Sequence, residues 1–145
     1  MNRLFNTNYN HRGLDIVLLI LRLAIALLML SHGIPKLNML LAGGEIKFMD
    51  PIGLGDTVTL VLAVFAEVIC SIFLLMGLAV RLAVLPLMVT MLIAIFIAHG
   101  NDGLKEKELA IHYLLAYIVL LFAGGGKISI DSLISRKVAR SRRYK

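Results

Sequence analysis

Four long apolar runs dominate the sequence and restrict what it can fold into. Residues 16–34, 58–80, 82–98 and 109–123 are almost continuously apolar. An α-helix needs about 20 such residues to cross the hydrocarbon core of a bilayer, and each run comes close to that length. Hydrophobic residues make up 59% of the chain and charged residues 17%, more apolar surface than a soluble domain of 145 residues could bury. The runs therefore predict a polytopic membrane protein.

Helices, rather than strands, are expected to span the membrane. Backbone polar groups in lipid must be hydrogen-bonded within the protein, and the runs lack the period-2 alternation of membrane strands. The predicted fold is all-α, an antiparallel bundle of four transmembrane helices over about residues 14–34, 57–80, 82–99 and 106–124. The whole chain, residues 1–145, is expected to form one domain. Pro35 is expected to end the first helix, because proline disfavours helix at the residue before it.

The distribution of Lys and Arg predicts the orientation of the chain. Lys and Arg gather in cytoplasmic segments of membrane proteins. The tail, residues 128–145, carries Arg136, Lys137, Arg140, Arg142, Arg143 and Lys145. The start carries Arg3 and Arg12 and the turn between the second and third spans carries Arg81, whereas residues 35–56 and 101–108 mix lysines with acids. Both termini are therefore expected in the cytoplasm.

The net charge of +6 requires no nucleic-acid partner. A basic tail beside a membrane suits anionic lipid, and this tail lacks the interleaved aromatic residues that favour nucleic-acid binding. Membrane lipid is the expected contact, and nucleic acid is not expected.

Two charged residues, Arg22 and Glu67, interrupt the first and second apolar runs. An isolated charge at mid-bilayer depth costs about 2.5–3.5 kcal/mol on insertion scales. Because both lie near the middle of neighbouring antiparallel spans, we predict that they form an ion pair inside the bundle. The pair could set the register of the two helices, or it could line a polar cavity or a proton-linked site. A third alternative is that Arg22 extends its side chain towards the inner surface instead.

A second group of polar residues is expected at the outer ends of the helices. His32 and Lys36 are one helical turn apart, Glu108 and His112 are one turn apart, and His99 closes the third span. Such residues favour either a polar ligand pocket or a set of interfacial side chains without a binding role. Imidazole and carboxylate can bind metals, but no metal motif is matched and no metal site is predicted. No catalytic residue is predicted, and the candidate ligand-binding residues are Arg22, Glu67, His32, Lys36, Glu108 and His112.

The single cysteine, Cys70, lies within the second run. One cysteine allows no internal disulfide and no Cys-x-x-Cys redox pair, so Cys70 is interpreted as a small buried apolar residue. The sequence also has no dinucleotide-binding glycine motif and no haem-attachment motif. No cofactor is evident from the sequence, and a quinone is the candidate ligand.

Three segments of the chain resemble the DoxX family of small four-helix bacterial membrane proteins. The segments are "LRLAIALLMLSHGIPKL" (residues 21–37), "FAEVICSIFLLMGLAVRLAVLPLMVTM" (65–91) and "AGGGKISIDSLI" (123–134). The residues that match the family pattern are Arg22, His32, Gly33, Lys36, Glu67, Gly77, Arg81, Gly126, Lys127 and Asp131. The resemblance implies a multi-pass protein of the bacterial inner membrane.

The resemblance also implies a class of function. The family is named from a subunit associated with thiosulfate:quinone oxidoreductase, and other members are linked to redox stress or quinone detoxification. It implies a redox-associated subunit, or a component that binds quinone or another small molecule; as an enzyme the chain would be at most a subunit of a quinone-linked membrane oxidoreductase. Electrons would come from a redox partner protein or from a cofactor held without a covalent bond. The long loop between the first and second spans, residues 38–56, has no cysteine, so a thiol relay is not expected.

The alternative is a non-enzymatic role, as an assembly partner in the membrane or a carrier of small solutes. A carrier built from one short chain would have to form a homo-oligomer. The small residues Ala63, Ala66, Ser71 and Gly77 are candidates for close helix packing between copies.

Overall fold

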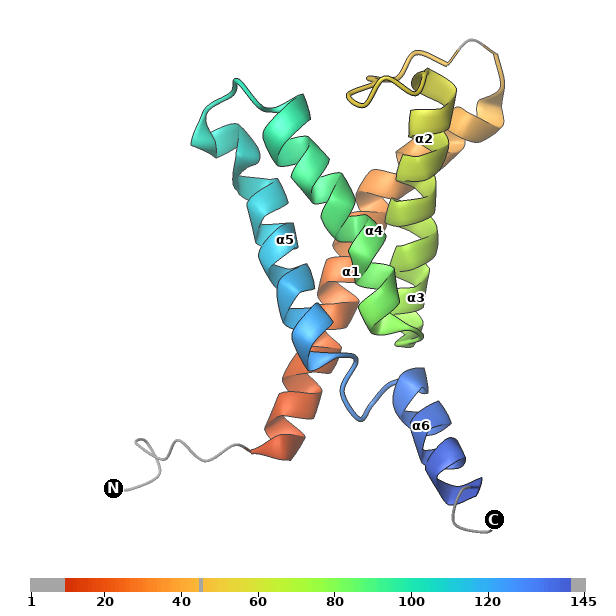
Figure 1. Cartoon of the computed structure of the whole chain (residues 1–145), viewed down its shortest axis with the longest axis vertical. Coiled ribbons are helices and arrows are strands. Elements are labelled where there is room, and N and C mark those ends of the chain that lie inside the picture. The colour runs from red at the N-terminus through yellow and green to blue at the C-terminus, as the bar shows by residue number, and fades with distance from the viewer. Residues whose placement is uncertain (1–9, 45, 142–145) are drawn as a thin grey trace.

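The computed structural model describes residues 10–44 and 46–141, and every regular element in these ranges is a helix (Figure 1). The elements are α1 (His11–Ala42), α2 (Asp56–Val64), η1 (Phe65–Cys70), α3 (Ser71–Met76), α4 (Val80–Ile93), η2 (Ala94–Ala98), α5 (Leu104–Ala123) and α6 (Ile130–Ser141), of which η1 and η2 are π-helical. The predicted all-α class is confirmed for these residues. Arg3, Glu45 and the last three basic residues of the predicted tail lie outside the described residues.

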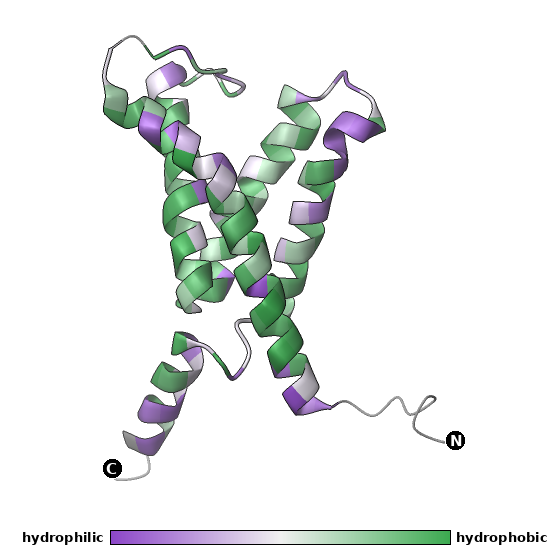
Figure 2. Ribbon diagram, turned by 180° about the vertical axis from the view of Figure 1, so that it is seen from behind, coloured by the Kyte–Doolittle hydropathy of each residue, from purple (hydrophilic) through white to green (hydrophobic). Residues whose placement is uncertain are grey.

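Within the described part of the chain, three helices are long and apolar enough to cross a membrane. They are α1, the continuous helix Asp56–Met76 formed by α2, η1 and α3, and the continuous helix Val80–Ala98 formed by α4 and η2. Figure 2 shows their largely hydrophobic surfaces. The fourth predicted span corresponds to α5, which is 20 residues long. It has four charged residues in its first five positions and is therefore too highly charged to be counted with these three helices.

The first helix does not end at Pro35, and that prediction is wrong. α1 runs for 32 residues with Pro35 inside it. Proline removes only the hydrogen bond to the carbonyl of Ser31, four residues earlier. Leu37 and Leu40, beyond the proline, pack on the buried cluster around Leu60. This packing supports the helix past the break.

The helices pack around α1 and separate towards one end. α4 lies along α5, whereas α1 contacts α2, η1, α3 and α5. The core where these helices meet is fully buried and includes Leu74, Val84, Leu87, Tyr117 and Leu120. The start of α1 and α6 lie at the same end of the molecule (Figure 1). At the opposite end, α2 diverges from α4 and α5 in both views.

The buried guanidinium of Arg22 joins α1 to the segment between α5 and α6. Its Nη1 donates to the carbonyl oxygen of Gly125 at 2.8 Å, and its Nη2 donates to that of Ile128 at 3.0 Å. The residue is only 2% exposed. A Cβ atom at Gly77 would lie 2.5 Å from Nη1, and one at Gly125 would lie 3.2 Å away. The two glycines therefore make room for the guanidinium.

Asp131 joins the same segment to the turn between α3 and α4. Its carboxylate accepts hydrogen bonds from the amides of Ala79 (2.7 Å) and Val80 (3.0 Å), and its own amide donates to the carbonyl of Gly77 at 3.0 Å. Ala79 has a φ of 48°, a left-handed conformation that costs free energy for a residue with a side chain. The bonds from Asp131 satisfy free amides at the start of α4 and hold this turn.

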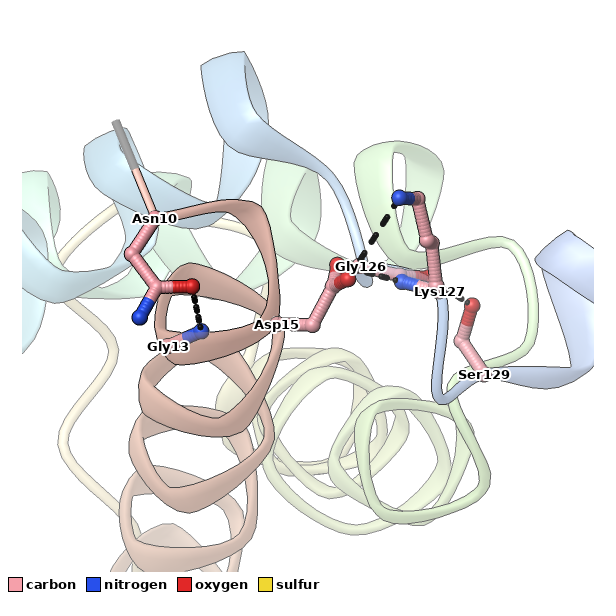
Figure 3. A network of polar contacts seen from close by, with 6 residues as sticks. All are labelled: Asn10, Gly13, Asp15, Gly126, Lys127 and Ser129. Carbon is pink, nitrogen blue, oxygen red and sulfur yellow. Dashed lines mark hydrogen bonds and ion pairs between the residues drawn. The ribbon is translucent and has the colours of Figure 1, made fainter. Parts of the chain in front are cut away.

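The start of α6 is capped by a side chain from the residue before it. Ser129 Oγ accepts from the amide of Ser132 at 3.2 Å and thus caps α6. Nearby, the carboxylate of Asp15 on α1 accepts from the backbone amide of Lys127 at 2.9 Å (Figure 3). Figure 3 also shows Asn10, whose side chain caps α1 by accepting from the amide of Gly13 at 3.2 Å.

Replacing Arg22 with Met should lower the stability of the whole bundle. Methionine replaces the aliphatic stem of Arg22 but leaves the carbonyls of Gly125 and Ile128 without donors. Each buried carbonyl that loses its donor costs about 1–3 kcal/mol. We expect a loss of about 2–4 kcal/mol in the free energy of unfolding. Cys70 is a native reporter, because it is buried and reacts with a thiol-specific dye only after unfolding. Arg12→Gln, at an exposed position, is the control; equal unfolding temperatures for the two variants would contradict the role of Arg22.

Candidate functional site

A cavity of about 600 Å³ is lined by α2 and η1 on one side and by α4, η2 and α5 on the other. Most of its wall is apolar, with side chains such as Met29, Phe65, Val89 and Ile93. Its polar side chains are those of His32, Lys36, Thr59, Glu67, Thr90, His99, Glu106 and Tyr113. Both the volume and the few polar groups in an apolar wall are typical of small-molecule sites.

An ion pair between Lys36 and Glu67 forms the charged centre of this wall. Lys36 Nζ lies 2.5 Å from Glu67 Oε1, and the two side chains are 28% and 5% exposed. The ring of Phe48, from the connection between α1 and α2, lies 5.8 Å from the same Nζ. The ammonium group is thus held between a carboxylate and an aromatic face, both of which favour a cation.

Close contact between α1 and η1 brings the pair together. Gly33 on α1 faces the backbone of η1: a Cβ atom there would lie 2.8 Å from Val68 Cγ2 and 3.0 Å from the carbonyl carbon of Glu67. Lys36 follows Gly33 by about one turn and therefore reaches the carboxylate of Glu67. The absence of a side chain at Gly33 makes the ion pair possible.

Two π-helical segments border the cavity. Phe65, Ala66 and Glu67 of η1 line one side, and Ala94 and Ala98 of η2 line the other. Short π-helical segments inside α-helices are rare and occur frequently at functional sites. Their presence on both sides of one cavity supports a functional role for it.

Buried polar atoms without hydrogen-bond partners lie next to this wall. Within the described residues, they are Glu67 Oε2, Ser71 Oγ, Tyr117 Oη and, at the other end of the molecule, Arg22 Nε. Tyr117 stacks on Tyr113 with ring centroids 6.2 Å apart, and Tyr113 meets the ring of His32 edge to face at 6.0 Å. A buried carboxylate oxygen without a donor is costly. Glu67 Oε2 is therefore a candidate to accept a hydrogen bond from a bound donor group.

The predicted ion pair between Arg22 and Glu67 is wrong. Arg22 binds the carbonyls of Gly125 and Ile128, and Glu67 pairs with Lys36. Glu67 lies beside Gly33 on α1. Gly33 comes eleven residues after Arg22, which corresponds to about 16 Å along the helix axis. The prediction placed Arg22 too deep because α1 extends beyond Pro35.

The other candidate residues divide into two groups. His32, Lys36 and Glu67 meet at the cavity, together with His99, whose Nδ1 is 2.7 Å from Asp102 Oδ2. Glu108 and His112 are exposed, and they are absent from the residues that line the cavity. Nδ1 of His112 lies 2.7 Å from the backbone carbonyl oxygen of Glu108, within the same helix. These two residues therefore do not belong to the site.

Sequence reasoning missed the cavity-lining residues Thr59, Thr90 and Glu106 as well as the loop side chain of Phe48. One signal in the sequence that could have pointed to the cavity wall was the pair Tyr113 and Tyr117, which are spaced by one helical turn in a mostly aliphatic run. Among the described residues, no group of three or more His, Cys, Asp or Glu side chains is arranged to hold a metal ion.

Asp50 holds the connection that leads into α2 beside the cavity. Its carboxylate accepts from Thr59 Oγ1 (2.7 Å), from the amide of Gly55 (2.6 Å) and from the amide of Leu54 (3.1 Å). The bond from Thr59, with the backbone bonds, holds the pKa of Asp50 below its usual value despite partial desolvation. Because Thr59 lines the cavity, this carboxylate links the loop to the site.

Comparison with known proteins gives the family. Residues 17–100 match the profile of the DoxX family, which is more than half of the chain. The chain belongs to the DoxX family. It is also 30% identical over 127 residues to an uncharacterised protein of Haemophilus influenzae, an alignment that covers 81% of this chain and 90% of that protein. No solved structure matches this DoxX-family chain.

Replacing Gly33 with Ala should destabilise the protein although alanine is the better helix former. The new methyl group would collide with Val68 and the backbone of Glu67 and push α1 away from η1. We expect a loss of about 1–3 kcal/mol in the free energy of unfolding, as for an overpacked core, measured by labelling of Cys70. Gly13→Ala is the matched control in the same helix, because its methyl group finds only ordinary contacts and should stabilise the helix. A stabilised Gly33→Ala variant would contradict the close contact.

Acid should loosen the loop held by Asp50. Since the pKa of Asp50 is lower in the folded protein than in the unfolded chain, its stabilisation is complete above the ordinary value of about 4 and is lost as the pH falls through the folded pKa. Hydrogen exchange at the amides of Leu54 and Gly55, corrected for its intrinsic pH dependence, should lose protection in that range. Asp50→Ala should show low protection at every pH; protection that persists in this variant would contradict the assignment.

Proposed function

We propose that this DoxX-family membrane protein binds a small lipophilic molecule of the quinone type in the cavity beside Lys36 and Glu67, as a subunit of a redox assembly. The observation that carries the proposal is one partly buried ion pair in the wall of a mostly apolar cavity. A quinone has a flat apolar ring and carbonyl oxygens that need donors. Lys36 has three N–H groups, of which Glu67 takes one, so donors remain for a carbonyl oxygen.

The rim of the cavity favours entry from the lipid. Leu62 and Phe65 on one side and Val89 on the other line the cavity and are each about half exposed. These side chains belong to helices that are apolar enough to cross a membrane. A lipophilic ligand could thus move from the bilayer into the cavity without crossing water.

The polar groups beside the cavity suit proton transfer. Reduction of a quinone to a quinol takes up protons as well as electrons. Glu67 has one buried carboxylate oxygen without a hydrogen-bond partner, and His32 lines the same cavity. Imidazole and carboxyl groups are the side chains that most often transfer protons in proteins. In this proposal the electrons come from a redox partner protein.

The proposed topology has four spans in the bacterial inner membrane with both termini in the cytoplasm. α5 is the fourth span: its charged first turn lies at the end opposite α6, and the rest of the helix is apolar. The end that holds the start of α1 and α6 carries Arg12, Arg81, Lys127 and the basic residues of α6. This asymmetry supports a cytoplasmic location for that end.

Quinone binding to the purified protein in nanodiscs tests the proposal. Lys36→Met should weaken the binding of a short-chain quinone about 10–100-fold, because a hydrogen bond to a charged group contributes about 1.5–3 kcal/mol. Glu108→Met, an exposed residue outside the cavity, should leave the affinity unchanged. Labelling of Cys70 shows whether each variant is folded. Unchanged affinity in a folded Lys36→Met variant would reject this site.

The alternative is a non-enzymatic assembly partner or a small-solute carrier, in which Lys36 and Glu67 only hold α1 against η1. It predicts that Lys36→Met lowers the unfolding temperature while no quinone binds to the parent protein. The small residues considered for packing between copies do not favour the carrier, because Ala66, Ser71 and Gly77 are buried within one chain.

A further inference from the structure

α6 has one apolar face, and that face is uncovered. Ile130, Leu133, Ile134 and Val138 follow the spacing of a single helical face. Leu133 is 57% exposed, Ile134 48% and Val138 47%, and no described residue covers them. Exposed apolar side chains on a helix that does not itself span the membrane mark a contact surface.

Basic residues follow one edge of this face. Arg136 and Arg140 are one turn apart and lie beside Leu133 on the helix surface. Lys137 falls within the apolar face itself, where its long stem can lie among apolar groups and carry the ammonium outward. An apolar face with basic residues along its edge matches the boundary between acyl chains and anionic headgroups.

The fold places α6 close to that boundary. α6 follows the apolar helix α5 after only a short glycine-rich segment, and that segment is fixed by Arg22 and Asp15. Asp131, in the first turn of α6, is bonded to the turn at the start of the apolar helix α4. α6 is therefore anchored where apolar helices end. Figures 1 and 2 show it leaving the bundle at an angle, and in Figure 2 it carries both green (hydrophobic) and purple (hydrophilic) residues.

We infer that α6 is an interfacial helix that binds anionic phospholipid of the same membrane. Its apolar face enters the acyl boundary, and Arg136 and Arg140 contact the phosphate groups of the lipid headgroups. The charge of the edge selects anionic over zwitterionic lipid, and the apolar face distinguishes this binding from a purely electrostatic contact.

Site-directed spin labelling of the full chain in nanodiscs tests this inference. A Cys70→Ala background allows a single label at Ile134→Cys, on the apolar face, or at Ala139→Cys, on the opposite face. In discs of phosphatidylcholine with phosphatidylglycerol, the label at 134 should be accessible to oxygen and protected from a water-soluble nickel reagent, and the label at 139 should show the reverse. Neutralising Arg136 and Arg140 to Gln should lower the equilibrium constant for binding of α6 to the anionic lipid surface by roughly fivefold per arginine, and 1 M salt should act in the same direction.

Native mass spectrometry of the chain with Cys70 intact provides a second readout that does not depend on the labelled background. The Arg136→Gln/Arg140→Gln double variant should retain fewer anionic lipids than the parent, whereas Lys105→Gln/Lys107→Gln, at the other end of the molecule, should retain as many. Equal accessibility of both labels to the nickel reagent would overturn the inference. So would protection of position 134 from both reagents, which would indicate a protein partner.

Discussion

The bonds of one buried guanidinium hold together parts of the chain that are far apart in sequence. Arg22 donates to two carbonyls more than a hundred positions later. Its guanidinium packs so closely on Gly77 and Gly125 that neither position has room for a side chain. An arginine side chain stays charged even when buried, so its bonds to carbonyl oxygens are strong and permanent. The same segment continues into Asp131, which bonds to the start of α4. One network therefore sets where α1, α4 and α6 begin relative to one another.

This fixed end leaves the opposite end free to hold a cavity. Because the helices are joined at the end that holds Arg22 and Asp131, α2 can diverge from α4 and α5 at the other end while the bundle stays closed. Charged residues at the open end are paired differently from Arg22: Lys36 binds Glu67 beside the cavity and remains partly accessible. The buried Arg22 and the partly exposed Lys36 thus have separate roles, one in the architecture and one at the candidate site.

Much of the fold follows from the sequence, but the candidate site follows only in part. The apolar runs predicted the three membrane-length helices and their approximate ends, apart from the C-terminal end of α1, because length and hydropathy define a spanning segment. The partner of Glu67 could not be predicted, since its depth depends on how far α1 continues, and packing by Leu37 and Leu40 overrides the proline signal. His32 and Lys36 line the cavity, whereas Glu108 and His112 lie outside it. The sequence could not separate the two groups, because the face of a helix that packs inward depends on its neighbours.

The π-helical turn at Glu67 also restricts how the gene can vary in length. A π-helical turn contains one residue more than an α-helical turn, so loss of one residue between Phe65 and Cys70 would leave a regular, continuous helix. Because both kinds of turn complete about 360°, the shorter turn would leave α2 and α3 in nearly the same rotational positions, and Leu74 and Gly77 would keep their places in the core and beside the guanidinium. Such a deletion would remove the extra residue from the turn that carries Glu67 in the cavity wall. Loss of a single residue from this turn should therefore disturb the cavity while the helical bundle survives.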